Sequence, residues 1–507
     1  MTFEEQTSQS TLTKSAKGSV YSIAVSAITI LLGFVRSVLL MRLLEPDMFG
    51  VVSLAVFFAT FLSPFCTLGI DSAVIQHPNP GKETLSTHFV LRLLLALIIL
   101  PVGGGGGLIL RRVYADQVVV VDVFLVLLTV NIIMALFSTP SAILRRDLRF
   151  GEIALLNLLA SIAMTVTALT LAYLGAGLWS LVAEQLISPI VRLIVIWSFF
   201  RPWRFSLRFS RSEAISLVRF GRHVFSANLL GILLDRFDDF WAGTAFGPTS
   251  LGYYSRAYEI AQYPERVLAT PITNVFFSAY AALQSDARAL SKAFFRSSGF
   301  LVRAGFLVTA VFGIAIPEIT VVLFGKNWLP VVPIFRLMLI YVMLDPLYAN
   351  LSYLLVGVGH PELLNRVRLI QVLVFIASVI GLAYLWEIQG IAVAADLMML
   401  CGVILLMVYG RRFVRYSLSR MLLIPLIAGV AAVGAGIGVS LVSEQVGIWQ
   451  MLIFKLLSVS SVYALIVYVA ERRIILEYGS EILLPLWKRI HLAFLISADS
   501  RGDRPDP

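Results

Sequence analysis

Arginines inside long apolar segments are the residues of this sequence best suited to binding a charged ligand. A charge at the centre of a membrane-spanning helix costs at least about 2.5–3.5 kcal/mol on insertion scales, so each one needs a compensating role. A guanidinium group binds phosphate through two parallel hydrogen bonds. We therefore interpret five arginines as candidate ligands of an anionic phosphate group: Arg36, Arg256, Arg266, Arg303 and Arg336.

A second set of charges in apolar segments is acidic. In LLDRFDDFWAG, Asp235 shares a helix face with Asp238 or Asp239, and Arg236 lies beside them. This is too much charge for a helix that faces lipid. It indicates a polar, water-filled lumen that binds sugars, or protons and cations during coupling. Asp71, near the end of the second apolar segment, belongs to the same set.

Each of these charges also has a structural interpretation. Arg36 lies near the end of its segment and could extend to the membrane interface. Arg256 and Glu259 are one turn apart and could pair with each other. The acidic cluster could pair with Arg256 or Arg266, and Asp71 could be an end-of-helix structural residue. Other intramembrane charges are expected to have structural roles: Glu184, Arg192 and Asp396 as ties between helices, and Lys455 by reaching the interface.

The amino-acid composition indicates that the segments carrying these charges lie in a membrane. Of 507 residues, 59% are hydrophobic and only 14% are charged, against about 25% in soluble domains. The apolar runs are near 20 residues long, whereas barrel strands give alternating segments of about 10 residues. We therefore predict an all-α polytopic membrane protein.

We expect about fourteen spanning helices. They are predicted at 18–41, 50–75, 87–110, 118–144, 153–174, 177–200, 223–246, 251–283, 293–323, 329–356, 363–386, 388–409, 421–442 and 448–469. The predicted organisation is a cytoplasmic tail (1–17), an N-lobe of six helices (18–200), a basic linker (201–222), a C-lobe of six helices (223–410), two extra helices (411–470) and a cytoplasmic tail (471–507).

An internal repeat supports the two lobes. LLEPDMFGVV around Pro46 matches AFGPTSLGYY around Pro248, an offset of 248 − 46 = 202. Pro140 corresponds to Pro346 at an offset of 206, and the GAGLWSLVAEQ and QGIAVAADL segments continue the series at 213. Repeats of this kind are typical of transporter folds, which place the substrate near the bilayer midplane.

The stretch Arg201–Arg222 carries six arginines against one acid, Glu213. Basic residues recur at alternate ends of the apolar segments, which predicts that both termini are cytoplasmic. Ser210 and Glu213 resemble a capping box, so a helix should start near Ser212. The linker is expected to lie on the anionic membrane surface, or to be a solvated loop that sets topology. Its predicted surface residues are Arg201, Arg204, Arg208 and Arg211.

Neither a metal nor a cofactor is expected. Cys66 and Cys401 lie in apolar segments and form no recognisable metal or redox motif. The net charge of +10 follows the ends of the apolar runs, so it does not indicate nucleic-acid binding. The polar start of the chain and the length of its first apolar run predict no cleavable signal peptide.

Four segments carry a family resemblance: RLLEPDMFG, LGIDSAVIQ, PSAILRRDLRF and LGYYSRAYEIAQYPERV. In this order, over about residues 15–470, they resemble the polysaccharide transporters of the multidrug/oligosaccharidyl-lipid/polysaccharide exporter superfamily, most closely the exopolysaccharide and colanic-acid type. The resemblance implies a bacterial inner-membrane flippase rather than an enzyme. It implies two six-helix lobes around a cationic cavity, and translocation of an undecaprenyl-pyrophosphate-linked oligosaccharide by alternating access.

Two other functions remain open. A cation-coupled multidrug exporter of the same superfamily would use the acidic cluster around Asp238 for its coupling ion. An integral-membrane polysaccharide polymerase is disfavoured, because no predicted exoplasmic loop is longer than about ten residues. The expected partners are a lipid-linked oligosaccharide and membrane lipids, with a polysaccharide polymerase and a chain-length regulator as candidate protein partners.

Overall fold

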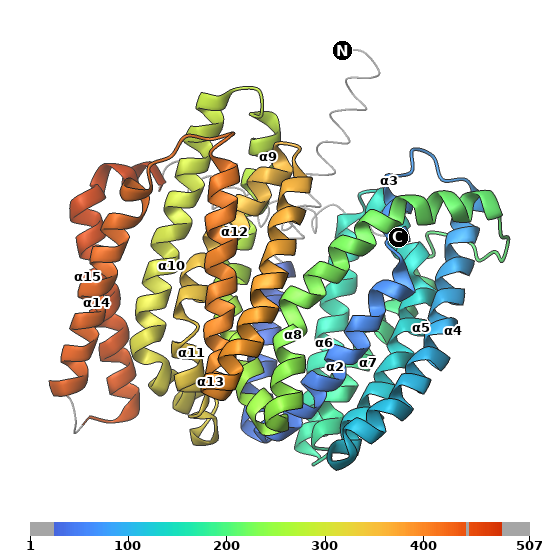
Figure 1. Cartoon of the computed structure of the whole chain (residues 1–507), viewed down its shortest axis with the longest axis horizontal. Coiled ribbons are helices and arrows are strands. Elements are labelled where there is room, and N and C mark those ends of the chain that lie inside the picture. Colours follow the sequence, from blue (N-terminus) through green and yellow to red (C-terminus); the bar gives the residue numbers. More distant parts are fainter. Residues whose placement is uncertain (1–24, 443–445, 479–507) are drawn as a thin grey trace, which may run out of the picture. The chain divides into compact units, whose positions relative to one another are not determined.

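The structure, a computed structural model, describes residues 25–442 and 446–478 (Figure 1). Within these ranges every regular element is a helix. The first helix, Val25–Leu43, is followed by α2 (Pro46–Thr67), α3 (Ile70–Gln76), α4 (Lys82–Val113), α5 (Val118–Arg146), α6 (Phe150–Tyr173), α7 (Leu178–Val195), α8 (Arg211–Pro264), α9 (Thr270–Ala282), α10 (Ala287–Leu323), α11 (Val331–Arg336), α12 (Leu339–Gly357), α13 (Pro361–Gly410), α14 (Leu418–Val442) and α15 (Ile448–Tyr478).

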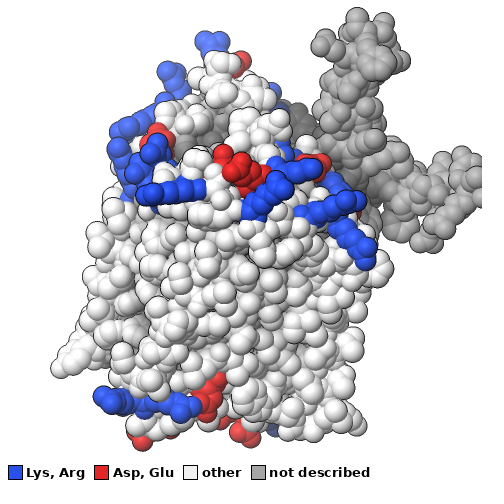
Figure 2. All heavy atoms as spheres, turned by 90° about the vertical axis from the view of Figure 1, so that its right-hand side faces the viewer, with Lys and Arg blue, Asp and Glu red and all other residues white. Residues whose placement is uncertain are grey.

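Twelve helical stretches of the described chain are long and apolar enough to cross a membrane. Two of them contain a break in helical geometry. In α8 the break is at Gly247, whose φ is 79°, and in α13 it is at Trp386 and Glu387. Each of these two stretches therefore holds two crossings, and the predicted all-α architecture of about fourteen spanning helices is confirmed. Figure 2 shows Lys and Arg in bands near the upper and lower edges of one face, with a wide uncharged belt between them.

The second predicted span is not the single helix expected over 50–75. It ends at Thr67, and α3 starts at Ile70 after two left-handed residues, Leu68 (φ 42°) and Gly69 (φ 70°). A Cβ added at Gly69 would lie 2.3 Å from the carbonyl oxygen of Gly221 on α8. Only glycine allows that approach, because it has no side chain and tolerates positive φ.

The span predicted over 251–283 is also interrupted. Between α8 and α9 the helix widens into a π-helical turn, η3 (Glu265–Ala269), which follows Pro264. The repeat offset of 202 maps Leu68 and Gly69 onto Thr270 and Pro271, directly after this turn. Interrupted helices at matching positions of two repeats are typical of transporters, where they mark functional sites.

The chain divides into two compact units. Unit 1 contains the first helix and Leu54–Ile232; unit 2 contains Glu45–Ser53 and the chain from Leu233 through α15. Helices α14 and α15, predicted as additional to the repeat, pack against α10 within unit 2 (Figure 1). The finer lobe and tail boundaries stay predictions, and the N-terminal tail lies outside the described residues.

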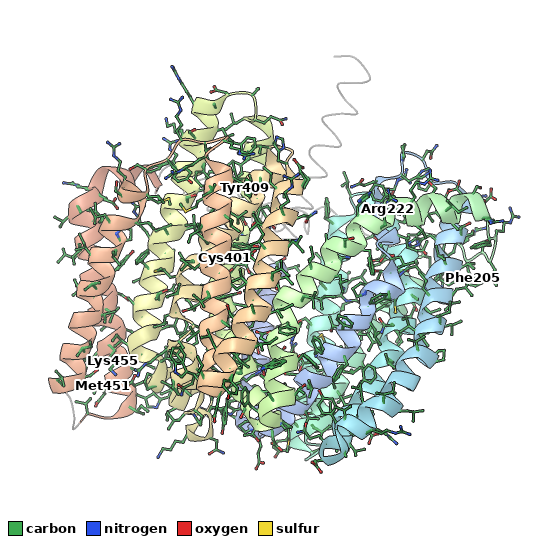
Figure 3. All side chains as sticks on the ribbon, in the orientation of Figure 1. Phe205, Arg222, Cys401, Tyr409, Met451 and Lys455 are labelled. Atoms are coloured by element: carbon green, nitrogen blue, oxygen red, sulfur yellow. The ribbon has the colours of Figure 1, made fainter. Side chains whose placement is uncertain are left out.

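The basic linker packs against α4 within unit 1. Helix α8 begins at Arg211, which confirms the predicted start near Ser212. Before it, the Ser210 N–H donates a 3.0 Å hydrogen bond to Thr87 Oγ1 on α4. Phe205, labelled in Figure 3, packs edge-on against Phe89 at 5.1 Å between ring centroids. Leu217 lies in a buried cluster with Ile70, Ala73, Val74 and Ala142.

Candidate transport site and intramembrane charges

Arg36 ties three helices of unit 1 together. Its Nη2 lies 3.0 Å from Glu184 Oε1 on α7, and its Nη1 lies 3.4 Å from Thr165 Oγ1 on α6. The side chain is 14% exposed, so it does not extend into the interface. The expectation that Glu184 ties helices together is confirmed, and its partner is Arg36.

Arg256 follows its structural interpretation. It forms an ion pair with Glu259 one turn later on α8, and its guanidinium lies 5.0 Å from the ring centroid of Phe49. The ion pair joins Arg256 Nη1 to Glu259 Oε2, whereas the Arg256 Nε is buried without a hydrogen-bond partner. A ligand could therefore gain a hydrogen bond here only by rearranging the pair.

Arg266 and Arg336 are the candidate arginines with exposed side chains. Arg266 donates to Gln262 Oε1, and the Arg336 Nε lies 3.3 Å from the carbonyl oxygen of Gly313. Neither forms an ion pair with a carboxylate of the described chain. Because their side chains are exposed, these two guanidinium groups are the most accessible to an anion, and Arg266 also lies in the field of Asp235, Glu265 and Asp345.

Arg303 is engaged inside unit 2. Its Nε lies 2.6 Å from Glu471 Oε2 and its Nη2 lies 2.5 Å from Glu471 Oε1, a bidentate pair that joins α10 to α15. Tyr463 on α15 donates to the Arg303 carbonyl oxygen at 2.8 Å. Both charged side chains are buried. This geometry gives Arg303 a strong structural role.

Lys455 does not reach the membrane interface, so that prediction was wrong. Its Nζ lies 2.7 Å from Glu318 Oε1 on α10, and the lysine is buried (labelled in Figure 3). The interpretation as an interfacial lysine failed because the partner is 137 residues away in the sequence. This pair and the Arg303–Glu471 pair join α15 to α10 at two levels.

The three aspartates of the acidic cluster in α8 differ in burial and in their partners. Asp238 is fully buried and accepts hydrogen bonds from the Tyr254 hydroxyl at 2.6 Å and from the Asp239 N–H at 3.0 Å. Asp239 pairs with Arg236 at 3.0 Å. Asp235 is exposed, and no described basic side chain lies within ion-pair distance of it. Of the three aspartates, only Asp235 is therefore exposed.

Asp71 belongs to a network that sequence reasoning missed. Its Oδ1 lies 3.0 Å from His88 Nε2 and 3.1 Å from Arg92 Nε, both on α4. His88 and Arg92 are almost completely buried, whereas Asp71 is 37% exposed. The signal that could have identified them was present, because a histidine and an arginine stand four residues apart at the start of an apolar run.

The predicted surface arginines of the linker are exposed: Arg201, Arg204, Arg208 and Arg211. Exposed Phe205, Leu207 and Phe209 alternate with them. An exposed basic segment with large apolar side chains has the chemistry of a membrane-surface contact. Elsewhere, no group of three or more His, Cys, Asp or Glu within the described ranges has an arrangement suited to a metal ion.

Residues 39–333 match the model of the Polysacc_synt_3 family, described as polysaccharide biosynthesis proteins. The match covers more than half of the chain. The protein belongs to this family.

Two bacterial proteins are similar to this chain in sequence. The lipopolysaccharide biosynthesis protein WzxC of Escherichia coli K12 is 21% identical over 377 residues, covering 72% of this chain and 75% of WzxC. The succinoglycan biosynthesis transport protein ExoT of Rhizobium meliloti 1021 is 25% identical over 343 residues, covering 66% of this chain and 67% of ExoT.

Two solved structures show the same fold. The lipid II flippase MurJ in an inward closed conformation superposes with a TM-score of 0.72 at 13% identity, over 90% of this chain and 99% of MurJ. An inward-facing MATE family multidrug resistance transporter has a TM-score of 0.58 at 19% identity, over 78% and 97% of the two chains. The chain therefore shares its fold with MurJ and with this MATE transporter.

Proposed function

We propose that this family member is a flippase-type transporter that moves a lipid-linked oligosaccharide across a bacterial inner membrane, with both termini in the cytoplasm. The observation that carries the proposal is that a polysaccharide biosynthesis family match and a MurJ-like fold occur in one chain. The names of WzxC and ExoT support a role in polysaccharide export. A transporter rather than an enzyme is consistent with these relatives.

The cargo would be an undecaprenyl-pyrophosphate-linked repeat unit in a cationic cavity, moved by alternating access of the two lobes. Exposed Arg266 and Arg336 are the strongest candidates for the pyrophosphate, because no described carboxylate pairs with them. Arg36 and Arg256 would have to exchange a glutamate partner for phosphate. Arg303 would have to leave a buried bidentate pair, which makes it the weakest candidate.

The polar walls would contact the sugars. Asp71 and Asp235 have exposed side-chain surface, whereas Asp238 and Asp239 are enclosed. The linker would rest on anionic lipid headgroups through Arg201, Arg204, Arg208 and Arg211. A polysaccharide polymerase and a chain-length regulator would be the protein partners, since the translocated unit must be polymerised on the far side.

The proposal is tested by complementation. The gene is expressed in a bacterium that lacks its own exopolysaccharide flippase but retains the glycosyltransferases, and surface polymer is measured together with periplasmic lipid-linked oligosaccharide. Restoration of both is the expected result. Accumulation of the lipid-linked unit on the cytoplasmic side, at normal protein level in the membrane and with several donor glycans, would contradict the proposal.

A cation-coupled multidrug exporter is the second candidate, because the MATE transporter shares the fold and Asp238 and Asp239 form a buried acidic pair in α8. The same strains distinguish the two functions. A drug exporter would raise resistance to cationic drugs without restoring polymer, and Asp239→Asn would abolish that resistance.

A further inference from the structure

A buried histidine joins α3, α4 and α5 at one corner of unit 1. His88 on α4 is fully buried; its Nε2 lies 3.0 Å from Asp71 Oδ1 on α3, and its Nδ1 lies 2.8 Å from Thr139 Oγ1 on α5. Arg92, one turn further along α4, contacts the same Asp71 oxygen and donates to the Cys66 carbonyl oxygen on α2. One histidine and one arginine thus connect four helices.

The repeat supplies an internal comparison. At the offsets of 202 and 206, α3, α4 and α5 correspond to α9, α10 and α12 of unit 2, and Arg92 corresponds to Ser298. Asn350 donates to Ser297 and Ser298 at 2.9 and 2.8 Å, and the Tyr280 hydroxyl donates to Asn350 Oδ1 at 2.9 Å. These neutral groups satisfy one another. The cluster of Tyr280, Ser297, Ser298 and Asn350 is therefore held by neutral hydrogen bonds, whereas the network of Asp71, His88 and Arg92 contains charged groups.

The hydrogen-bond geometry allows His88 to gain or lose a proton in place. A carboxylate only accepts, so Nε2 must carry a proton to bond with Asp71 in either state. In the neutral ring, Nδ1 accepts from the Thr139 hydroxyl. In the imidazolium, Nδ1–H donates to Thr139, whose hydroxyl rotates. The exchangeable proton is therefore the one at Nδ1.

The two states differ in net charge. With neutral His88, the negative Asp71 balances the positive Arg92. Protonation leaves one uncompensated positive charge in a buried site, and Arg145 at the end of α5 acts on Asp71 from the same side. From α2 the neighbour is the buried Cys66 thiol. A buried unpaired charge is unfavourable, so protonation should favour an arrangement in which the network meets water.

The connection before α3 provides a place for such a movement. Leu68 and Gly69 hold positive φ between α2 and α3, and Gly69 packs directly on the backbone of Gly221 in α8. Buried Leu217, one turn before Gly221, presents only an apolar side chain to α3. Asp71, at the start of α3, is the member of the network that reaches solvent.

We propose that His88 is a proton-binding site whose occupancy controls the packing of α3 on α4 and α5. We further propose that this site couples proton binding to transport. This second proposal rests on the proposed function. The ligand is a proton delivered through Asp71. Loss of the proton restores the balanced network, and gain of it releases α3 about the Leu68–Gly69 break.

The first experiment does not depend on transport. The full chain, with Cys66 and Cys401 replaced by Ser and Gln76→Cys labelled with an environment-sensitive fluorophore at the end of α3, is placed in lipid nanodiscs and titrated. A pH-dependent change in fluorescence that requires His88 is expected. His88→Gln should abolish it. His360→Gln is the matched control, because His360 forms an exposed histidine–carboxylate pair with Glu362 at 2.8 Å; this variant should titrate like the parent.

A second measurement covers the case in which His88→Gln fails to fold. The other four histidines, His77, His223, His360 and His491, are replaced by Gln, and the chain is labelled with ¹⁵N-histidine. Its ring nitrogens should move between the neutral and imidazolium shifts in the same pH range as the fluorophore. A ring whose shifts stay constant over the whole pH range in which the protein stays folded would overturn the proton site.

The coupling of proton binding to transport is tested separately. In the complemented strain, His88→Gln should lower polymer export at least about tenfold, while His360→Gln exports normally. Normal export by His88→Gln would overturn coupling. If the parent chain fails to export but the titration appears, the proposed function is wrong and the proton site stands.

Discussion

Gly50 and Gly252 belong to the two copies of the repeated proline–glycine motif, and each glycine packs against the backbone of the other copy. A Cβ on Gly50 would stand 1.7 Å from the carbonyl oxygen of Pro248, and a Cβ on Gly252 would stand 1.9 Å from that of Pro46. All four residues belong to unit 2. The contact is reciprocal, as a two-fold relation between two copies of a motif requires.

The same offset holds for a third pair. Ser53 and Ser255, also 202 residues apart, face each other with their hydroxyl oxygens at 3.4 Å, and both are buried. The proline–glycine motif that indicated the repeat in the sequence is therefore also the place where its two copies meet. This contact explains why each copy requires a glycine four residues after its proline.

Replacing either glycine with alanine should disrupt this contact. The clash is with a carbonyl oxygen of the main chain, so no side-chain rotation relieves it. Gly50→Ala and Gly252→Ala should each destabilise the protein by about 1–3 kcal/mol, the usual cost of overpacking. Thermal unfolding in detergent measures the effect.

The matched control is Gly104→Ala in α4, where the added Cβ meets nothing within 4 Å. This variant should be unchanged or slightly more stable, because alanine is the better helix former. Equal melting temperatures for all three variants would contradict the reciprocal contact.

A second prediction concerns Arg303 and Glu471. Arg303→Ala leaves a buried carboxylate unpaired, which typically costs about 3–5 kcal/mol, so the melting temperature should fall sharply. The double variant Arg303→Met/Glu471→Leu removes both charges and should recover most of the loss. If export recovers with stability, the role of Arg303 is structural; stable protein without export would instead assign Arg303 to the cargo.

Local sequence patterns were sufficient to predict most of the membrane-spanning segments of this fold. Runs near 20 residues predicted the crossings, and the capping-box pattern of Ser210 and Glu213 predicted where α8 begins. The break at Leu68–Gly69 was missed because the apolar run continues through it. Its cause is a contact with Gly221, which lies 152 positions further along the chain (221 − 69).

Partners of the intramembrane charges were harder to predict for the same reason. Arg256 and Glu259, one turn apart, could be paired from spacing alone. Arg36 meets Glu184, and Lys455 meets Glu318, across distances in the sequence that no local pattern encodes. Whether an arginine is free to bind phosphate depends on these long-range pairs.

The exposed arginines of unit 2 should act on transport without affecting stability. Arg266→Ala and Arg336→Ala remove a guanidinium that has no described ion-pair partner, so the free energy of unfolding should stay within about 0.5 kcal/mol of the parent value, as for other surface changes. Loss of a bidentate phosphate contact should lower export about tenfold, which corresponds to about 1.4 kcal/mol. Arg112→Ala, an exposed arginine at the end of α4, is the control and should export normally. Normal export by the double variant Arg266→Ala/Arg336→Ala would remove both from the cargo site.

The linker should bind anionic lipid through its charge rather than through the shape of its guanidinium groups. Each Arg near an anionic membrane surface contributes about 1 kcal/mol, so changing Arg201, Arg204, Arg208 and Arg211 to Gln should weaken the stabilisation that anionic nanodiscs give over neutral ones. The matched control changes the same four residues to Lys, which keeps the charge and should keep the stabilisation. Added salt should reduce the parent to the level of the Gln variant, because exposed charges are screened. If the Gln and Lys variants respond alike to anionic lipid, the linker is a solvated loop whose arginines set topology and do not hold the membrane.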